Sequence, residues 1–281
     1  MRVPNSKPLH VTGRSKRTLK SSAKTLLRYE RPVSICAVLI AFVVAWELAV
    51  RYFAISTFLL PAPSVIISEF ITEPGLYLNA TLYTFMTTFI GFVLAVVFGV
   101  ALAVGVVYST FIERTIYTLL VALNAVPKVA MAPLFVIWMG VGISPKIAIA
   151  LTIAIFSIVI AMVQGLRGAD PDLLALAQAS RAPAWQVLFK IRMPSALPSL
   201  FSGMKISVSV ALVGAIVGEF VAGSQGLGQL ILVAEGNFQT PRMFVALVIL
   251  GLMGTVLYYA VEFLEKIMTP WHVSRRDKTG K

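Results

Sequence analysis

Residues 165–198 read GLRGADPDLLALAQASRAPAWQVLFKIRMPSALP, and long apolar runs lie on both sides of this segment. The segment is polar, basic and interrupted by proline, whereas the whole chain is 58% hydrophobic and only 13% charged. Soluble globular domains carry about 25% charged residues. The composition therefore indicates an all-α integral membrane protein. We predict that residues 165–198 lie outside the lipid and contact a partner there.

The apolar runs predict six transmembrane helices, because a spanning helix needs about 20 mostly apolar residues. The expected spans are 33–53, 80–108, 114–139, 146–165, 197–221 and 242–266. They form a single membrane domain over residues 32–270, with the polar loop at 166–196. A basic tail over 1–31, expected to be partly disordered, precedes this domain, and a second basic tail over 271–281 follows it.

Six spans place both termini on the same side of the membrane. With the termini in the cytoplasm, 19 of the 24 Lys and Arg residues lie in cytoplasmic segments. Cytoplasmic segments of membrane proteins are enriched in Lys and Arg. We therefore predict cytoplasmic termini and a cytoplasmic loop at 166–196. The net charge of +12 is explained by the bilayer, and no nucleic acid partner is expected.

Two of the predicted spans carry a small residue at every fourth position. The stripes are Gly91, Ala95, Gly99 and Ala103 in one span and Gly203, Ser207, Ala211 and Ala215 in the other. Small residues allow helix backbones to approach closely in a membrane. The stripes predict packing within the helix bundle, and the alternative is that one of them forms a homodimer interface.

The polar loop has the pattern of two short helices joined by a bend. Asp170-Pro171 is typical of a helix start, because Asp caps free N–H groups and Pro fits the first turn. Pro183 disfavours α geometry at the residue before it and predicts the bend. A second helix over 184–192 is expected to end at Met193-Pro194. Its apolar face, formed by Trp185, Leu188 and Phe189, either docks into a groove of a partner protein or lies on lipid headgroups.

The spacing within this loop resembles that of permease subunits of bacterial ATP-binding cassette (ABC) importers. The family pattern is Glu-Ala-Ala, three residues, Gly, nine residues, Ile, one residue and Leu-Pro. The matching positions here are Ala175-Leu176-Ala177, Arg181, Ile191 and Met193-Pro194. Arg181 in place of Gly is the main departure, because a positive φ at the bend would cost arginine about 1 kcal/mol or more. Either Pro183 makes the bend differently, or Arg181 is strained.

Three further stretches are similar to the branch of this family that imports nitrate, sulfonates, taurine, related small molecules and some pyrimidine vitamin precursors. They are LLPAPSVI at 59–66, PKVAMAPLFVIWMGVG at 127–142 and VGEFVAGSQGLGQLI at 217–231. The resemblance covers about residues 40–272. It implies a type I importer permease fold in a multi-pass protein of the bacterial inner (cytoplasmic) membrane, transporting one of these solutes.

The resemblance also implies the partners. Two permease chains, expected to be a homodimer, would form the pathway, and a periplasmic or lipid-anchored binding protein would deliver the solute. The loop would insert as a coupling helix into a cleft of a separate ATPase subunit. The residues expected to carry this coupling are Ala177, Arg181, Pro183, Ala184, Trp185, Gln186, Leu188 and Phe189.

Four residues are candidates for the pathway or its gate. Lys128 lies in AVPKVAMAPLF (125–135), where two prolines interrupt the predicted third span. A charge within the membrane is a functional candidate, and the alternative is that Lys128 extends to the membrane surface. Glu219 precedes a glycine-rich stretch that contains Ser224 and Gln225. Glu219 is expected to be either a gate or docking contact or a structural hydrogen-bond partner of nearby backbone.

The residue types needed for enzyme chemistry are scarce. The chain contains no GxxxxGK[ST] phosphate loop, and both of its histidines, His10 and His272, lie in the tails. We therefore expect no enzyme activity, cofactor or metal. The alternative function is an ATP-independent secondary transporter or channel, which predicts more intramembrane charges and internal repeats than this sequence shows.

Overall fold

The computed structural model describes residues 34, 37–124 and 126–270, so the tails expected at 1–31 and 271–281 lie outside the described residues. The chain divides into two units, residues 1–64 and 65–281. The first unit contains a helix over 37–52. Glu47 in this helix is hydrogen-bonded to Ser64, the last residue of the unit. The Glu47 carboxyl accepts hydrogen bonds from the N–H (3.0 Å) and the hydroxyl (2.8 Å) of Ser64 and pairs with Arg51 at 2.6 Å.

From Pro63 onward the described residues form helices and turns, and α2 begins with the last two residues of the first unit. In chain order the helices are α2 (Pro63–Thr72), α3 (Pro74–Tyr108), α4 (Thr110–Ile112), η1 (Glu113–Tyr117), α5 (Thr118–Asn124), η2 (Lys128–Met131), α6 (Ala132–Met139), α7 (Ile143–Arg167), α8 (Pro171–Ala179), α9 (Ala184–Val187), η3 (Leu188–Arg192), α10 (Met193–Ala222), α11 (Leu227–Gly236) and α12 (Thr240–Met268). Of these, η1 and η3 are π-helical turns and η2 is a 3₁₀ turn.

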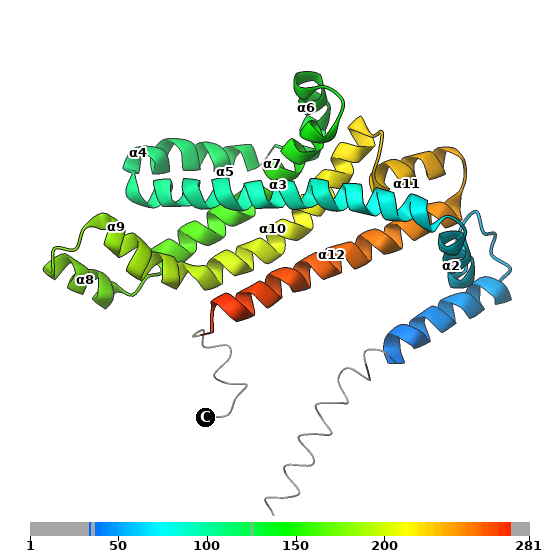
Figure 1. Ribbon diagram of the computed structural model, residues 1–281, viewed down its shortest axis with the longest axis horizontal. Coiled ribbons are helices and arrows are strands. Elements are labelled where there is room, and N and C mark those ends of the chain that lie inside the picture. The colour runs from blue at the N-terminus through cyan, green and yellow to red at the C-terminus, as the bar shows by residue number, and fades with distance from the viewer. Residues whose placement is uncertain (1–33, 35–36, 125, 271–281) are drawn as a thin grey trace, which may run out of the picture. The chain divides into compact units, whose positions relative to one another are not determined.

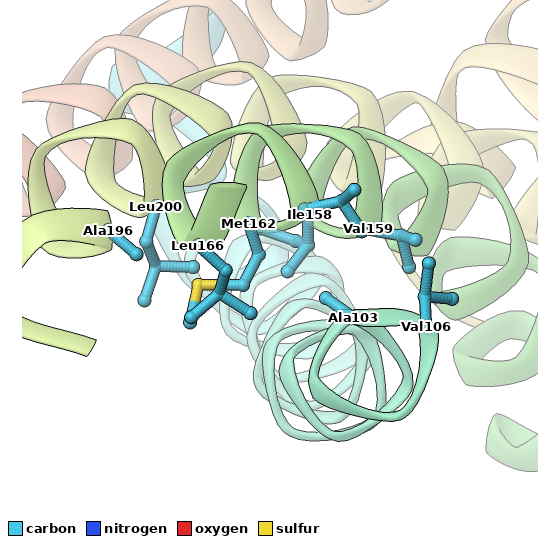
Figure 2. Packing of buried hydrophobic residues seen from close by; sticks show 9 residues of the cluster. Ala103, Val106, Ile158, Val159, Met162, Leu166, Ala196 and Leu200 are labelled. Atoms are coloured by element: carbon cyan, nitrogen blue, oxygen red, sulfur yellow. The ribbon is translucent and has the colours of Figure 1, made fainter. Parts of the chain in front are cut away.

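The centre of the second unit is α7, which packs against both α3 and α10. Along the other side of α10 lies α12, and α11 packs against α12 (Figure 1). A buried apolar cluster joins α3, α7 and α10. Its side chains labelled in Figure 2 are Ala103, Val106, Ile158, Val159, Met162, Leu166, Ala196 and Leu200. In lipid, close van der Waals packing of this kind holds helices together, because the surrounding acyl chains are equally apolar.

The two small-residue stripes lie inside this bundle, and all eight of their residues are buried. A Cβ atom added at Gly91 of α3 would lie 2.6 Å from Cβ of Ala150, and one added at Gly203 of α10 would lie 2.5 Å from Cβ of Ala161. Both contacted residues belong to α7. The prediction of packing within the bundle is therefore confirmed, and the stripes are already used within one chain.

A substitution at Gly214 of α10 should destabilise this bundle. An added Cβ would lie 2.7 Å from Cα of Ala150, a backbone atom that cannot rotate away. Overpacking typically costs about 1–3 kcal/mol. We expect Gly214→Ala to lower the melting temperature of the detergent-solubilised protein by several degrees. Gly251→Ala on α12 is the matched control, because nothing lies within 4 Å of its added Cβ. Equal melting temperatures of the two variants would contradict the packing argument.

Four helices among the described residues are long and apolar enough to cross a membrane: Pro74–Tyr108, Ile143–Arg167, Ala184–Ala222 and Thr240–Met268. The predicted span at 33–53 is described only in part, as the helix over 37–52. The predicted span at 114–139 is not one continuous helix. It is divided into η1, α5, η2 and α6. Pro127 is extended before η2, and Pro133 lies in the first turn of α6, because a proline has no N–H to donate within a helix.

The expected helix end at Met193-Pro194 is wrong. From Ala184 the chain remains helical through η3 and α10 to Ala222. Pro194 lies in the first turn of α10, and the wider π-helical turn η3 precedes it. A missing N–H is tolerated there. The second loop helix and the following span are therefore one continuous helix, so a force on the loop acts directly on α10.

Candidate functional site

The first candidate site is the segment between α7 and α10, where α8 begins as the sequence predicts. Asp170 is the N-cap of α8, and its side chain accepts a hydrogen bond of 2.9 Å from the Asp172 N–H. Pro171 occupies the first turn. The helix ends at Ala179 with Ser180 as its C-cap, and Figure 1 shows α8 and α9 together at one end of α7 and α10.

The bend between α8 and α9 is built on a left-handed residue. Arg181 has φ +52°. Its N–H donates to the Gln178 carbonyl at 3.0 Å, and the Ala182 N–H donates to the Ala177 carbonyl at 2.9 Å. These two bonds form a Schellman motif, in which glycine usually takes the left-handed position. An L-residue pays about 1–2 kcal/mol for this conformation. Of the two alternatives drawn from the sequence, the strained Arg181 is therefore present, and Pro183 takes an extended conformation as the N-cap of α9.

The residues predicted to carry coupling differ in exposure. Trp185 is 60% exposed and Phe189 is 61% exposed, and Leu176 of α8 in the same loop is 66% exposed. Arg181, Pro183 and Ala184 are also exposed, whereas Gln186 is partly buried and Ala177 is buried. Leu188 packs against the apolar cluster of Figure 2. The predicted face is thus split, because Leu188 anchors the loop while Trp185 and Phe189 point away from the bundle.

Two residues that the sequence did not single out fasten the loop to the bundle. The Tyr108 hydroxyl, at the end of α3, donates to the Ala184 carbonyl at 3.4 Å. Arg192 donates from Nη1 to the Leu166 carbonyl at 3.1 Å, and its guanidinium lies 5.8 Å from the centre of the Tyr108 ring. The one available signal was an arginine between Ile191 and Met193-Pro194 at the boundary of an apolar run.

A cavity of about 230 Å³ lies between part of the loop and the end of α3. It is lined by Tyr108, Leu174, Ala177, Gln178, Ala182, Ala184, Val187 and Arg192. Next to the loop, Arg167 at the end of α7 pairs with Glu113 of η1 at 2.6 Å. The loop is therefore held at both of its ends, by contacts to α3 and by the junctions with α7 and α10.

The second candidate site lies at the opposite end of α10, around Glu219. Glu219 is fully buried. Its carboxyl accepts hydrogen bonds from the Thr84 hydroxyl (2.8 Å) and from the Gly228 N–H (2.7 Å). The Leu227 N–H in turn donates to the Thr84 hydroxyl oxygen at 2.9 Å. Glu219 and Thr84 thus accept from the first two N–H groups of α11, which are the groups that a helix start leaves without internal partners.

The glycine-rich stretch closes tightly over Glu219. Gly226 has φ +113°, a conformation that L side chains rarely adopt. A Cβ added at Gly226 would lie 2.2 Å from Cδ of Glu219, and one added at Gly228 would lie 2.9 Å from Oε2. The geometry matches the structural role weighed for Glu219, a hydrogen-bond partner of nearby backbone.

Substitution of Gly226 should disrupt this turn. Gly226→Ala would meet both a backbone conformation that is essentially confined to glycine, at about 1–3 kcal/mol, and a clash with the Glu219 carboxyl. We expect a clear loss of folded, monodisperse protein in size-exclusion chromatography after detergent extraction. Gly236→Ala, at the other end of α11, has nothing within 4 Å of the added Cβ and should behave as wild type. Normal recovery of the Gly226→Ala variant would show that the turn relaxes without cost.

A buried lysine supports the same turn from α7. Lys146 lies in the first turn of α7 and is fully buried. Its ammonium donates to the Tyr83 hydroxyl (3.1 Å) and to the Gln225 carbonyl (3.3 Å), and it lies 4.4 Å from the centre of the Tyr83 ring. Gly218 permits this arrangement, since an added Cβ there would lie 2.8 Å from Cα of Lys146.

A cavity of about 590 Å³ lies beside the turn. Its lining includes both predicted pathway residues of the glycine-rich stretch, Ser224 and Gln225, together with Asn79, Tyr83 and Gln229. Arg242 also lines it and is paired with Glu69 and Glu73, each at 3.1 Å. The cavity therefore offers mainly amides and hydroxyl groups on an apolar wall.

Lys128 has other neighbours. Its ammonium donates to the side-chain oxygen of Asn124 and lies 5.1 Å from the centre of the Phe156 ring. Neither Asn124 nor Phe156 lines the 590 Å³ cavity. Ser224 and Gln225 thus line one cavity, whereas Glu219 supports the adjoining turn without lining that cavity. Lys128 lies in η2, where the predicted third span is interrupted.

The sequence of the chain is similar to those of known transport proteins. Residues 95–270 match the family described as binding-protein-dependent transport system inner membrane component. The chain belongs to this family. The permease is 35% identical to the riboflavin transport system permease protein RibX of Chloroflexus aurantiacus, over 89% of this chain and 95% of that protein. It is 32% identical to the formylaminopyrimidine transport permease protein ThiX of Halalkalibacterium halodurans, over 81% of this chain and 91% of that protein.

The fold of the permease is shared with solved transporters. The MetNI methionine ABC transporter, in inward-facing conformations, matches with a TM-score of 0.61 at 19% identity, covering 70% of this chain and 98% of the matched chain. The permease is therefore a membrane-spanning subunit of an ABC importer of type I fold and a multi-pass inner membrane protein. Subunits of this family are not enzymes, and they work with an ATPase and a substrate-binding protein. The family predicted from the loop spacing and the branch predicted from the stretches at 59–66, 127–142 and 217–231 are confirmed.

Proposed function

We propose that two copies of the permease form the translocation pathway and that the loop over 166–196 of each copy docks into a cleft of an ATPase subunit. The observation that carries this proposal is the exposed apolar face of Trp185 and Phe189 on a loop fastened to the bundle. A buried groove on a partner would remove these rings from water, and burial of aromatic anchors dominates interface energetics.

The continuity of the loop with α10 supports transmission of movement. Because α9, η3 and α10 are continuous from Ala184 to Ala222, a displacement of the docked face is passed to the whole of α10. At the other end, α10 carries Glu219, which holds the turn beside the 590 Å³ cavity. The proposal therefore places ATPase docking at one end of α10 and a gate region at the other.

The charge distribution supports a cytoplasmic loop and cytoplasmic termini. In that orientation 19 of the 24 basic residues lie in the cytoplasm, as expected for inner membrane proteins. Ser224 and Gln225 then lie toward the periplasm, where a binding protein would release its solute. We assign Glu219 to the support of this region, and Lys128 remains a candidate contact of the pathway at the break between α5 and α6.

The solute that we propose is a neutral heteroaromatic vitamin or vitamin precursor. The relatives described above, RibX and ThiX, carry names that specify riboflavin and formylaminopyrimidine transport. The cavity near the gate agrees with a neutral solute, since Arg242 in its wall is already paired with two carboxylates. Amides and hydroxyl groups can hydrogen-bond ring nitrogens and carbonyl groups without an opposing charge.

The testing experiment is reconstitution of the permease with the ATPase and binding protein that co-purify with it, followed by uptake assays with labelled riboflavin, formylaminopyrimidine and taurine. We expect ATP-dependent uptake of one of the two heteroaromatic compounds. Uptake of taurine alone would contradict the solute and leave the permease role intact. Uptake that persists without ATP and without an ATPase subunit would favour an ATP-independent transporter.

A further inference from the structure

Arg181 occupies a position that the backbone disfavours for any residue other than glycine. It lies at the left-handed position of the Schellman motif that ends α8, with φ +52°. A glycine would form the same two hydrogen bonds without strain, since both use backbone atoms. Strained residues persist where the surrounding structure or a function maintains them. The backbone hydrogen bonds therefore give no reason for an arginine at this position, and the reason must lie in its side chain.

Within the described part of the chain, the Arg181 side chain has no hydrogen bond or ion pair, and the residue is exposed. The other arginines that border the loop differ in this respect. Arg167 pairs with Glu113 at 2.6 Å, and Arg192 donates to the Leu166 carbonyl at 3.1 Å. The structure thus uses Arg167 and Arg192 internally and leaves the guanidinium of Arg181 available to a partner.

The surroundings of Arg181 define the kind of partner. Trp185, four residues further on, is 60% exposed, and Leu176, five residues earlier, is 66% exposed. The acidic residues of the loop, Asp170 and Asp172, lie at the opposite end of α8, where Asp170 caps the helix. The exposed residues on both sides of the bend are therefore apolar, and Arg181 adds a positive charge at the bend itself.

We propose that Arg181 pairs with a carboxylate of the ATPase subunit, at the rim of the groove that receives Trp185 and Phe189, and that this charge helps to determine which ATPase the permease accepts. The inference rests on the proposed docking of the loop. Guanidinium groups suit carboxylates, because the planar fork matches both oxygens. A charge at the rim of an interface governs specificity and salt dependence more than total affinity.

Two other roles of Arg181 fit the geometry less well. A basic residue near the end of α8 interacts favourably with the helix dipole, but the last turn of the helix offers that interaction without a positive φ. A lipid headgroup layer also attracts basic residues, but it requires no defined position of the charge. The left-handed conformation sets the direction in which the Arg181 side chain leaves the bend, on a segment where Trp185 and Leu176 are exposed, and a defined direction suits pairing with one discrete carboxylate.

The test measures the affinity of the purified ATPase subunit, isolated as the partner of the wild-type chain, for the full-length permease in lipid nanodiscs. Dissociation constants are compared over a series of NaCl concentrations for wild type and for Arg181→Ala, Arg181→Gly and Arg181→Lys. Lys190→Ala is the matched control, because Lys190 is also an exposed basic residue of the loop. Nanodiscs of neutral and of anionic lipid are used in parallel.

We expect Arg181→Ala and Arg181→Gly to weaken binding about fivefold at low salt, with Arg181→Lys closer to wild type. The difference should disappear at high salt, and Lys190→Ala should have a smaller effect. Equal losses for Arg181→Ala and Lys190→Ala would overturn the specific pair in favour of diffuse attraction. An effect seen only with anionic lipid would assign Arg181 to headgroups.

The failure of this inference can be separated from the failure of docking. Trp185→Ala in the same assay reports on docking alone. If Trp185→Ala weakens binding while Arg181→Ala and Arg181→Gly bind as tightly as wild type at low salt, docking stands and the Arg181 pair is rejected. If none of these variants changes the affinity, the loop is not the docking element and both proposals fail.

Discussion

Trp185→Ala should abolish most ATPase association while the permease remains correctly inserted in the membrane. The Trp185 side chain is 60% exposed on the loop and makes no ring contact with another aromatic residue of the described chain. Its removal should therefore cost little internal stability. Truncation of an aromatic anchor at the centre of an interface typically costs about 2 kcal/mol or more, which corresponds to a dissociation constant raised about thirtyfold.

The measurement is recovery of the ATPase with tagged permease in mild detergent, followed by ATP-dependent uptake in reconstituted vesicles. Trp138→Ala is the matched control, because Trp138 of α6 is 68% exposed and lies outside the loop. We expect both variants to reach the membrane in normal amounts and only Trp185→Ala to lose the ATPase. Recovery of a stoichiometric complex with Trp185→Ala would remove this residue from the docking face.

Glu219→Leu should destabilise the permease more strongly than any substitution on its exposed faces. The fully buried carboxyl accepts from the Thr84 hydroxyl and from the Gly228 N–H, and leucine leaves both donors without an acceptor. Each buried donor left unsatisfied costs about 1–3 kcal/mol. The start of α11 should detach, which would also deform the cavity wall at Ser224 and Gln225. We expect a large fall in melting temperature and loss of uptake.

Glu219→Gln separates the structural role from a direct role in gating. Glutamine keeps the shape and one acceptor oxygen, so a purely structural Glu219 predicts a melting temperature lowered by several degrees and uptake reduced in proportion to the folded fraction. Glu235→Gln on α11 is the control, because Glu235 is exposed. A Glu219→Gln variant with wild-type stability and no uptake would instead assign the carboxyl to the gate.

Local sequence rules worked where the deciding contacts are local. Asp170 caps α8 because its side chain reaches an N–H two residues away, and Pro171 fits the first turn. The small-residue stripes of α3 and α10 predicted packing within the bundle, because side-chain size alone decides how closely two helix backbones can approach. Both predictions required only the residue types and their spacing.

Sequence rules did not predict the backbone conformation where the same residues fit two alternative conformations. Pro194 was expected to end a helix, but a π-helical turn over 188–192 places it in the first turn of α10. The sequence offered two solutions for the bend, one with Pro183 and one with a strained Arg181. The hydrogen bonds from Arg181 and Ala182 back to α8 decide for the strained arginine.

Composition and residue spacing were enough to predict a helical membrane protein, a basic loop between its spans, and the spacing of an ABC importer permease in that loop. Only the tertiary structure showed that Thr84 and Glu219, 135 residues apart, hold the start of α11 together. It also showed that Lys146 is buried beneath the glycine-rich turn. Composition and periodicity report the preferences of one segment at a time, whereas a buried polar residue is defined by partners that arrive from distant segments.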